Sequence, residues 1–375
     1  MGIPNKFLQL SPTFYVAVHK SCQHDRMYTF PTPAEPPKRL SLALQGGGAH
    51  GAFTWGVLDA LLEDGRFDFD GISGASAGAI NAIALAQGYL GHPPGDDERQ
   101  AIRASARQTL RRVWEGVVAL GSVGALTQSV MHMMLNTSMG GHMLQSAMAP
   151  WMSPSQMNPM DINPLRKLLA THIDFEGLAR LHSPRVFVSA THVRTGLAKV
   201  FSGRQLDLQA VMASTCLPMV FRTVEIDGEP FWDGGYSSNP PLIPLIKQCD
   251  AQDILVVQIN PLQRHETPHS QQDILDRVNE LTFNASLLDQ MRNVEFINQL
   301  IERGRMQEGE DYRRIRLHRI DGGQGLEDLP ASSKVATDGD MIERLFNMGK
   351  EAAKHWLKRH VDDVGVRATL RLPKP

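Results

Sequence analysis

Short apolar runs alternate with stretches of helical periodicity along most of the chain. Residues 40–45 are an apolar run that ends at three glycines, which predicts a buried strand. Helices are predicted over residues 51–63, 77–90, 273–303 and 340–360, and further strands over 186–191, 222–226, 254–260 and 314–320. Strands interleaved with helices predict a three-layer α/β/α fold around a central, mostly parallel sheet.

The same pattern suggests how the chain is divided. We expect residues 1–39 to be an irregular extension with a proline-rich linker, residues 40–360 to be a single domain, and residues 361–375 to be a tail. Residues 116–160 carry no charged side chain and hold nine of the 17 methionines. They suit a buried helical subdomain, an adaptable apolar lid or capping insert, or both.

Composition narrows the functional classes. The 38 basic and 40 acidic residues nearly balance, so no overall field favours nucleic acid. The three cysteines fit neither a disulfide framework nor a zinc site, and they favour a reducing compartment. No signal-peptide pattern and no run of about 18 apolar residues is present, so we expect a soluble, cytoplasmic protein.

The first candidate for chemistry is the glycine-rich turn after the first strand, which comprises Gly46, Gly47, Gly48, Ala49, His50 and Gly51. It contains G-x-G-x-x-G, but Asp68 and Asp70 do not end an apolar strand as a dinucleotide site requires. No Lys-Ser/Thr pair follows, which excludes a P-loop. The remaining interpretations are a tight strand–helix turn and an anion site or oxyanion hole built from backbone N–H groups.

The second candidate is the G-x-S-x-G sequence formed by Gly74, Ser76 and Gly78. Flanking glycines allow a sharp turn that exposes a serine hydroxyl, and the following helix favours negative charge there. Ser73 is a weaker alternative because its own frame lacks the second glycine.

The third candidate is Asp233, followed by Gly234 and Gly235. Residues 224–226 and 229–232 predict a hairpin around the turn Asp227-Gly228, which would deliver Asp233 at a strand end. A second Asp-Gly-Gly sequence begins at Asp321, and we interpret it as a plain turn after a strand.

Together these three elements resemble the patatin-like phospholipase family, in particular its bacterial acyl hydrolases. The family pattern is G-G-G-x-[RK]-G, then G-x-S-x-G, then a distant D-G-[AG]. The likeness includes residues 163–166, 213–218 and 239–240, and it covers roughly residues 40–260. The ordered set is far more specific than any one motif.

The resemblance implies a patatin-like fold and a serine acyl hydrolase, of phospholipase A or lysophospholipase type, that cleaves lipid acyl esters. Ser76 would attack the ester carbonyl, Asp233 would accept its proton, and the glycine loop would stabilise the oxyanion. The resemblance implies no cofactor and no metal. Peripheral contact with the inner membrane face would suit the lipid substrate. Where the family has Arg or Lys, this chain has His50, which would remove a fixed positive charge from the loop.

Two other classes stay open. An α/β-hydrolase triad would need a histidine, and the candidates are His265, His269, His318, His355 and His360. A non-catalytic lipid-binding module would suit the uncharged segment and the helically spaced stripe Arg103, Arg107 and Arg111, although that stripe is typical of a solvated face. A nicotinamide oxidoreductase is a more distant alternative.

Overall fold

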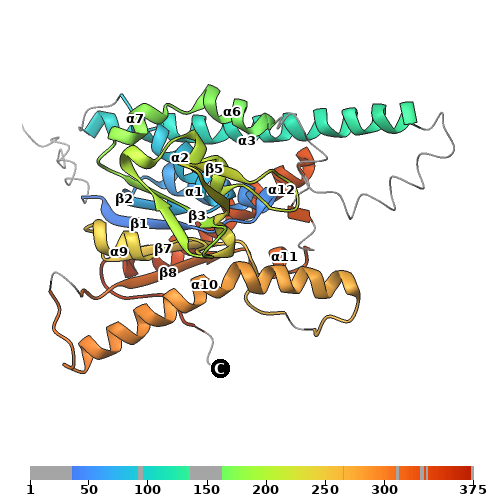
Figure 1. Ribbon diagram of the computed structural model, residues 1–375. Helices are drawn as coiled ribbons and strands as arrows, with labels where there is room; N and C mark the ends of the chain where they lie inside the picture. The colour runs from blue at the N-terminus through green and yellow to red at the C-terminus, as the bar shows by residue number, and fades with distance from the viewer. Residues whose placement is uncertain are drawn as a thin grey trace, which may run out of the picture. The chain divides into compact units, whose positions relative to one another are not determined.

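Figure 1 shows the computed structural model of the protein. It describes residues 36–91, 96–135, 163–264, 266–309, 312–329, 333–334 and 337–372, with the backbone alone for 96–97, 122–135 and 272. The described residues from Pro37 onward form one compact unit. The predicted extension therefore lies almost wholly outside the described residues.

One sheet organises the described part of the chain, with strand order β5-β6-β3-β2-β1-β7-β8 and β4 also paired to β3. The strands are β1 (Lys38–Leu44), β2 (Phe67–Gly74), β3 (Arg185–His192), β4 (Ala198–Phe201), β5 (Val224–Ile226), β6 (Glu229–Asp233), β7 (Asp253–Gln258) and β8 (Arg316–Asp321). Strands β3, β2, β1, β7 and β8 run parallel, whereas β4, β5 and β6 add antiparallel pairs at one side. The predicted mostly parallel sheet is confirmed.

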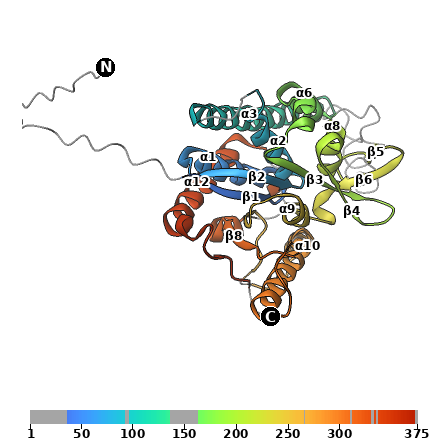
Figure 2. The same ribbon diagram turned by 90° about the vertical axis from the view of Figure 1, so that its left-hand side faces the viewer.

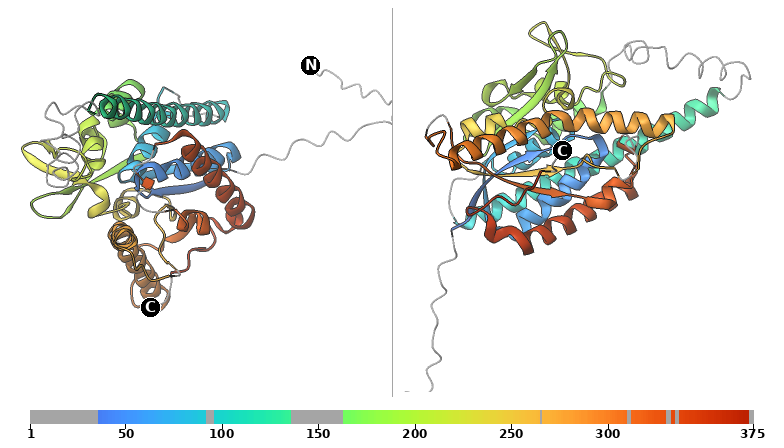
Figure 3. Two further views of the ribbon diagram at one scale, coloured as in Figure 1. Left: turned by 90° about the vertical axis from the view of Figure 1, so that its right-hand side faces the viewer. Right: turned by 90° about the horizontal axis from the view of Figure 1, so that it is seen from below.

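Both faces of the sheet are covered because its central strands are apolar on both sides. Leu40 and Leu42 of β1 pack into one cluster with the helices α1, α2, α3 and α12, while Ala43 belongs to a second cluster with α9 and α10. Successive side chains of a strand point to opposite faces, so one strand contributes to two cores. Figures 2 and 3 show α10 and α12 on opposite sides of the sheet. The three-layer architecture follows.

The helices connect the strands and bury their apolar stripes against the sheet. They are α1 (Gly51–Asp64), α2 (Ala77–Gln87), α3 (Asp96–Leu135), α6 (Pro164–His172), α7 (Phe175–Arg180), α8 (Leu208–Ser214), α9 (Ile243–Gln248), α10 (Gln271–Glu302), α11 (Gly323–Glu327) and α12 (Gly339–His360). The four helices predicted from periodicity are all present, with ends shifted by at most three residues. Among the described residues, no helix combines the length and the apolarity needed to cross a membrane.

Two segments differ from the expectations. Strand β2 was not predicted, because Asp68 and Asp70 interrupt its apolar pattern. Residues 361–372 are not detached from the domain, since the N–H groups of Thr369 and Leu370 donate to the carbonyl of Leu317.

The predicted arginine stripe lies on α3, but it is not merely solvated. The guanidinium of Arg107 binds the buried carboxylate of Asp59, with Nε 2.6 Å from Oδ1. Lys350 of α12 binds the other oxygen of the same carboxylate at 2.9 Å, so Asp59 joins α1 to both α3 and α12.

Candidate active site

Ser76 occupies a strained turn between β2 and α2. Its φ and ψ angles are 53° and −126°, a region that non-glycine residues seldom adopt and that costs on the order of 1–3 kcal/mol. The flanking glycines permit the turn, because a Cβ at Gly78 would lie 2.0 Å from the carbonyl oxygen of Leu44, and one at Gly74 would lie 2.4 Å from the Gly78 carbonyl. The structure is the sharp strand-to-helix turn that the sequence predicted.

The surroundings of Ser76 distinguish it from Ser73. The backbone N–H of Ser76 donates to Ser214 Oγ at 3.0 Å, which holds the turn from α8. Ser76 lines a cavity and retains 6% exposure. Ser73 lies inside β2 with no exposure, and its hydroxyl has no partner among the described residues. Only Ser76 is open to a substrate.

Asp233 is the buried carboxyl group that faces this serine. It ends β6, is fully buried, and accepts the Gly235 N–H through Oδ1 at 2.7 Å. Burial raises the pKa of Asp233 to about 7, although the Ser76 hydroxyl and the Gly235 N–H both act as donors that oppose the rise. Its Oδ2 has no partner of normal hydrogen-bond geometry among the described residues. The hydroxyl therefore approaches the carboxyl group without completing a well-formed bond, as is common before substrate binds.

The two glycines after Asp233 let other backbone and ring atoms pack against the turn. A Cβ at Gly234 would lie 2.2 Å from the carbonyl oxygen of Ser189, and one at Gly235 would lie 2.4 Å from the ring of Phe283 on α10. The predicted hairpin before it is confirmed: β5 and β6 are antiparallel, and Asp227 and Gly228 both have positive φ, at 54° and 77°.

Side chains from distant segments anchor the glycine loop. The Gly46 N–H donates to Asn239 Oδ1 at 2.7 Å, and its carbonyl accepts Asn239 Nδ2 at 3.2 Å and Asn260 Nδ2 at 2.9 Å. A Cβ at Gly46 would lie 2.4 Å from the carbonyl oxygen of Ala75, so the loop packs directly on the serine turn. Because its N–H is already bonded, Gly46 is an anchor of the loop rather than a free donor.

The remaining residues of the glycine loop differ in what they contact. Among the described residues, no acceptor takes the N–H of Gly47 or Gly48. Gly48 has a φ of 59°, and both Gly48 and Ala49 line the cavity beside Ser76. Gly51 begins α1 against the side chain of Ala77. The loop thus retains two backbone N–H groups that have no acceptor among the described residues.

His50 stands where the related motif has a cation, and it is neutral. Its side chain is buried, and Nε2 lies 2.7 Å from Ser333 Oγ. Burial, together with the nearby charge of Lys334, lowers the pKa of His50 to about 3. His50 is not among the residues that line the cavity.

The cavity above Ser76 has a volume of about 340 Å³ and a mostly apolar lining. Its walls include Ile80 of α2, Trp114 of α3, Leu165 of α6 and Phe221 after α8. Val117 and Leu120, at the start of the uncharged segment, also line it. Residues 122–135 of that segment continue α3 and are described by their backbone alone, so the side chain of Met133 lies outside the described residues, as does all of Met143.

The histidines that a triad would require are elsewhere. Of the five candidates, His265 lies outside the described residues, and the other four do not line the cavity: His269, His318, His355 and His360. His318 is fully buried between Asp253 Oδ1 and Thr369 Oγ1, at 2.9 and 3.0 Å, where it joins β7, β8 and the C-terminal residues. None of the four described candidates therefore lies at the cavity that Ser76 lines, whereas the carboxyl group of Asp233 faces that serine.

Several residues of the site could not be identified from the sequence. Ser214 and Asn239 fell inside segments noted for their resemblance, but their hydrogen bonds could not be foreseen. Asn260, Phe283 and Lys334 carry no local signal at all, because they reach the site only through the tertiary fold.

Comparisons with known proteins show which family the chain matches. A sequence model of the family described as patatin-like phospholipase matches residues 42–246. The curated protein YjjU of Escherichia coli strain K12, described as uncharacterized, is 25% identical over 238 residues, which are 62% of this chain and 55% of YjjU. The chain thus spans little more than half the length of that relative. The solved structure of VipD from Legionella pneumophila matches with a TM-score of 0.41 and 16% identity, over 87% of this chain and 67% of VipD.

Proposed function

Because this chain belongs to the patatin-like phospholipase family, we propose that it hydrolyses acyl esters of lipids through Ser76 and Asp233. The observation that carries the proposal is a strained serine beside a fully buried carboxyl group, at the wall of an apolar cavity. We assign the catalytic domain to residues 40–360.

In the proposed reaction, Ser76 Oγ attacks the ester carbonyl carbon while its proton passes to the Asp233 carboxylate. The tetrahedral intermediate collapses, and the leaving alcohol takes that proton. Water then attacks the acyl-enzyme and gives a proton to Asp233. As the fatty acid departs, Asp233 returns that proton to Ser76 Oγ, which restores both groups. A base whose pKa is about 7 suits both transfers near neutrality.

The N–H groups of Gly47 and Gly48 are the oxyanion donors in this proposal. They are free of other acceptors among the described residues, and the anchoring of Gly46 by Asn239 and Asn260 holds them in place. Donors fixed before the reaction need no reorganisation as negative charge develops.

Two surface features support the use of lipid at an interface. Val220 lines the cavity and is 48% exposed, and the neighbouring Met219 is 78% exposed. Apolar groups at the mouth of an apolar cavity suit peripheral contact with a lipid surface. The described cysteines, Cys216 and Cys249, are buried and not joined in a disulfide, which suits the reducing cytoplasm that we propose as the location.

The test combines a substitution with a covalent probe. Ser76→Ala should lower ester hydrolysis by about 10³-fold or more, because no other group can form the acyl-enzyme. A fluorophosphonate should label the wild type but not this variant, and Ser73→Ala is the control that should keep both labelling and activity.

Two results would contradict the proposal. Label on a serine other than Ser76 would refute the assignment of the nucleophile. Lipid binding without hydrolysis by the wild type would favour the non-catalytic module.

A further inference from the structure

The positive charge that the related motif carries at position 50 is absent from the glycine loop of this chain. His50 is buried and neutral, and it is bound to the hydroxyl of Ser333. The residue next to Ser333 is Lys334, so the same contact brings a cation from near the end of the chain to the loop.

The backbone of Lys334 packs directly on the glycine loop. A Cβ at Gly48 would lie 2.2 Å from the carbonyl oxygen of Lys334, so only glycine fits beneath it. Lys334 lines the cavity together with Gly48 and Ser76. Among the described residues that line this cavity, it is the only one with a charged side chain.

The side chain of Lys334 runs from its backbone contact with Gly48 to α10, where the ammonium group is held. Lys334 Nζ donates to Asn279 Oδ1 at 2.9 Å and lies 5.4 Å from the centre of the Phe283 ring. That ring is the one that packs against Gly235, two residues after Asp233. Both neighbours of the ammonium are uncharged, and both belong to α10.

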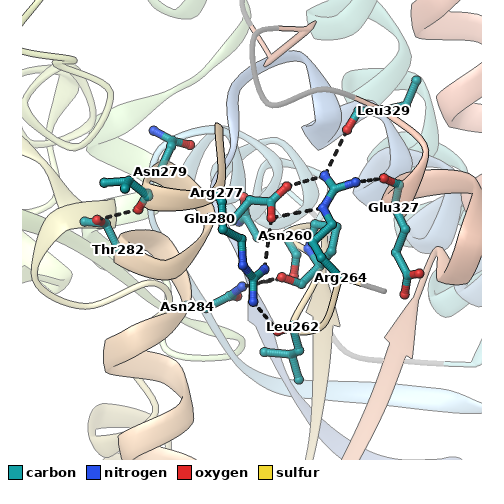
Figure 4. A network of polar contacts seen from close by, with 12 residues as sticks. Asn260, Leu262, Arg264, Arg277, Asn279, Glu280, Thr282, Asn284, Glu327 and Leu329 are labelled. Atoms are coloured by element: carbon teal, nitrogen blue, oxygen red, sulfur yellow. Dashed lines mark hydrogen bonds and ion pairs between the residues drawn. The ribbon is translucent and has the colours of Figure 1, made fainter. Parts of the chain in front are cut away.

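No carboxylate of the described residues lies within ion-pair distance of this ammonium. The buried carboxylate of Glu280 is bound instead by Arg264 and Arg277, as Figure 4 shows. Burial lowers the pKa of Lys334 to about 8, while the more distant Glu280 and Asp276 oppose the change and Arg264 adds to it. The group is therefore charged at neutral pH and not neutralised by a partner.

We propose that the Lys334 ammonium stabilises the tetrahedral oxyanion of the reaction, in place of the cation that the related motif carries at position 50. This inference rests on the proposed function, because it requires acyl transfer to Ser76. A fixed charge in an apolar cavity acts more strongly on the anionic transition state than on the neutral ester. Lys334 therefore raises kcat more than it lowers KM.

The first experiment removes the charge. Lys334→Met keeps most of the aliphatic chain and should lower kcat about tenfold to a hundredfold on a neutral chromogenic ester, with KM changed by less than about threefold. Lys334→Arg should keep most of the activity. Lys199→Met is the matched control, because Lys199 also lies near a phenylalanine ring, 5.9 Å from the centre of Phe201, but does not line the cavity. An unchanged kcat, or an equal loss in the Met and Arg variants, would overturn the proposal.

The second experiment neutralises the charge without touching Lys334. Asn279→Asp places a carboxylate 2.9 Å from the ammonium and should lower kcat as Lys334→Met does. Asn293→Asp, on the exposed part of the same helix, should leave kcat unchanged. An Asn279→Asp variant with wild-type kcat would overturn the proposal even if Lys334→Met failed to fold.

Fluorophosphonate labelling of Ser76 distinguishes a failure of the proposed function from a failure of the role of Lys334. Wild-type enzyme that neither reacts with the probe nor hydrolyses ester would refute the proposed function itself. Wild-type activity that is insensitive to both substitutions would refute the role of Lys334 alone.

Discussion

Two Asp-Gly-Gly turns follow strands of the same sheet, and their carboxyl groups lie in different environments. Asp233 ends β6 and Asp321 ends β8, and in each case Oδ1 accepts the N–H of the glycine two residues on, at 2.7 and 3.2 Å. Asp233 is fully buried. The side chain of Asp321 is 39% exposed and pairs with Arg319 at 2.9 Å.

The difference lies in what surrounds the turns, not in the turns themselves. A Cβ at Gly235 would strike Phe283, whereas nothing lies within 4 Å of a Cβ at Gly323, whose φ is 50°. The first turn is pressed between other elements, which excludes water and raises the pKa of its carboxyl group. The second is an ordinary turn at the surface. Burial beside a hydroxyl group, rather than the tripeptide, is what makes an aspartate a candidate base.

The largest effect should come from removing each carboxylate in turn. Asp233→Asn should lower turnover by about 10³- to 10⁵-fold, because an amide cannot accept the serine proton. Asp321→Asn should leave turnover within about twofold. Steady-state rates on one soluble ester measure both effects. Equal losses in the two variants would show that the two aspartates do not differ in their role.

The same substitution, Asp233→Asn, should raise the free energy of unfolding relative to the wild type at neutral pH, although it lowers activity. The pKa of Asp233 is about 7 in the folded state and about 3.9 when unfolded, so the wild type loses up to about 4 kcal/mol as pH rises from about 4 to 7. Asn does not titrate, so the advantage of Asp233→Asn should grow across that window and level off above pH 7. Denaturant unfolding at pH 4.5 and pH 8 measures it, and a gap independent of pH would argue against the raised pKa.

A smaller effect is expected in the pH profile of the wild type. If Asp233 must be ionised to act as base, kcat/KM should fall about tenfold per pH unit below about 7, reaching about a hundredfold at pH 5. Asp321→Asn should show the same profile. A rate that stays flat from pH 5 to 8 would exclude Asp233 as the titrating base.

Much of the fold could be predicted because periodicity is a local property. The predicted strands and helices occur with small shifts at their ends, and the Asp227-Gly228 hairpin is present. Strand β2 could not be recognised, because its two aspartates are accommodated by tertiary contacts. Asp70 accepts the N–H groups of residues 250 and 251, and Asp68 pairs with Arg99 at 3.5 Å.

Some residues of the candidate site could likewise be predicted from local sequence, and others could not. Ser76, Asp233 and the glycine loop are marked by glycines, whose spacing reflects close backbone approaches and is visible in the sequence. Asn260, Phe283 and Lys334 act through side chains of ordinary type in unremarkable contexts. Nothing local sets Lys334 apart from any other lysine until the fold places it over Gly48.

The anchoring of the glycine loop also bears on when activity can arise during synthesis of the chain. Asn260 holds Gly46, and Phe283 and Lys334 follow still later, beyond the stretch 42–246 that matches the family. A ribosome will have made the nucleophile and its base long before these supports emerge. On the proposed mechanism, the nascent chain carries the serine and its base before the residues that support them, so activity should appear only after those residues have been made.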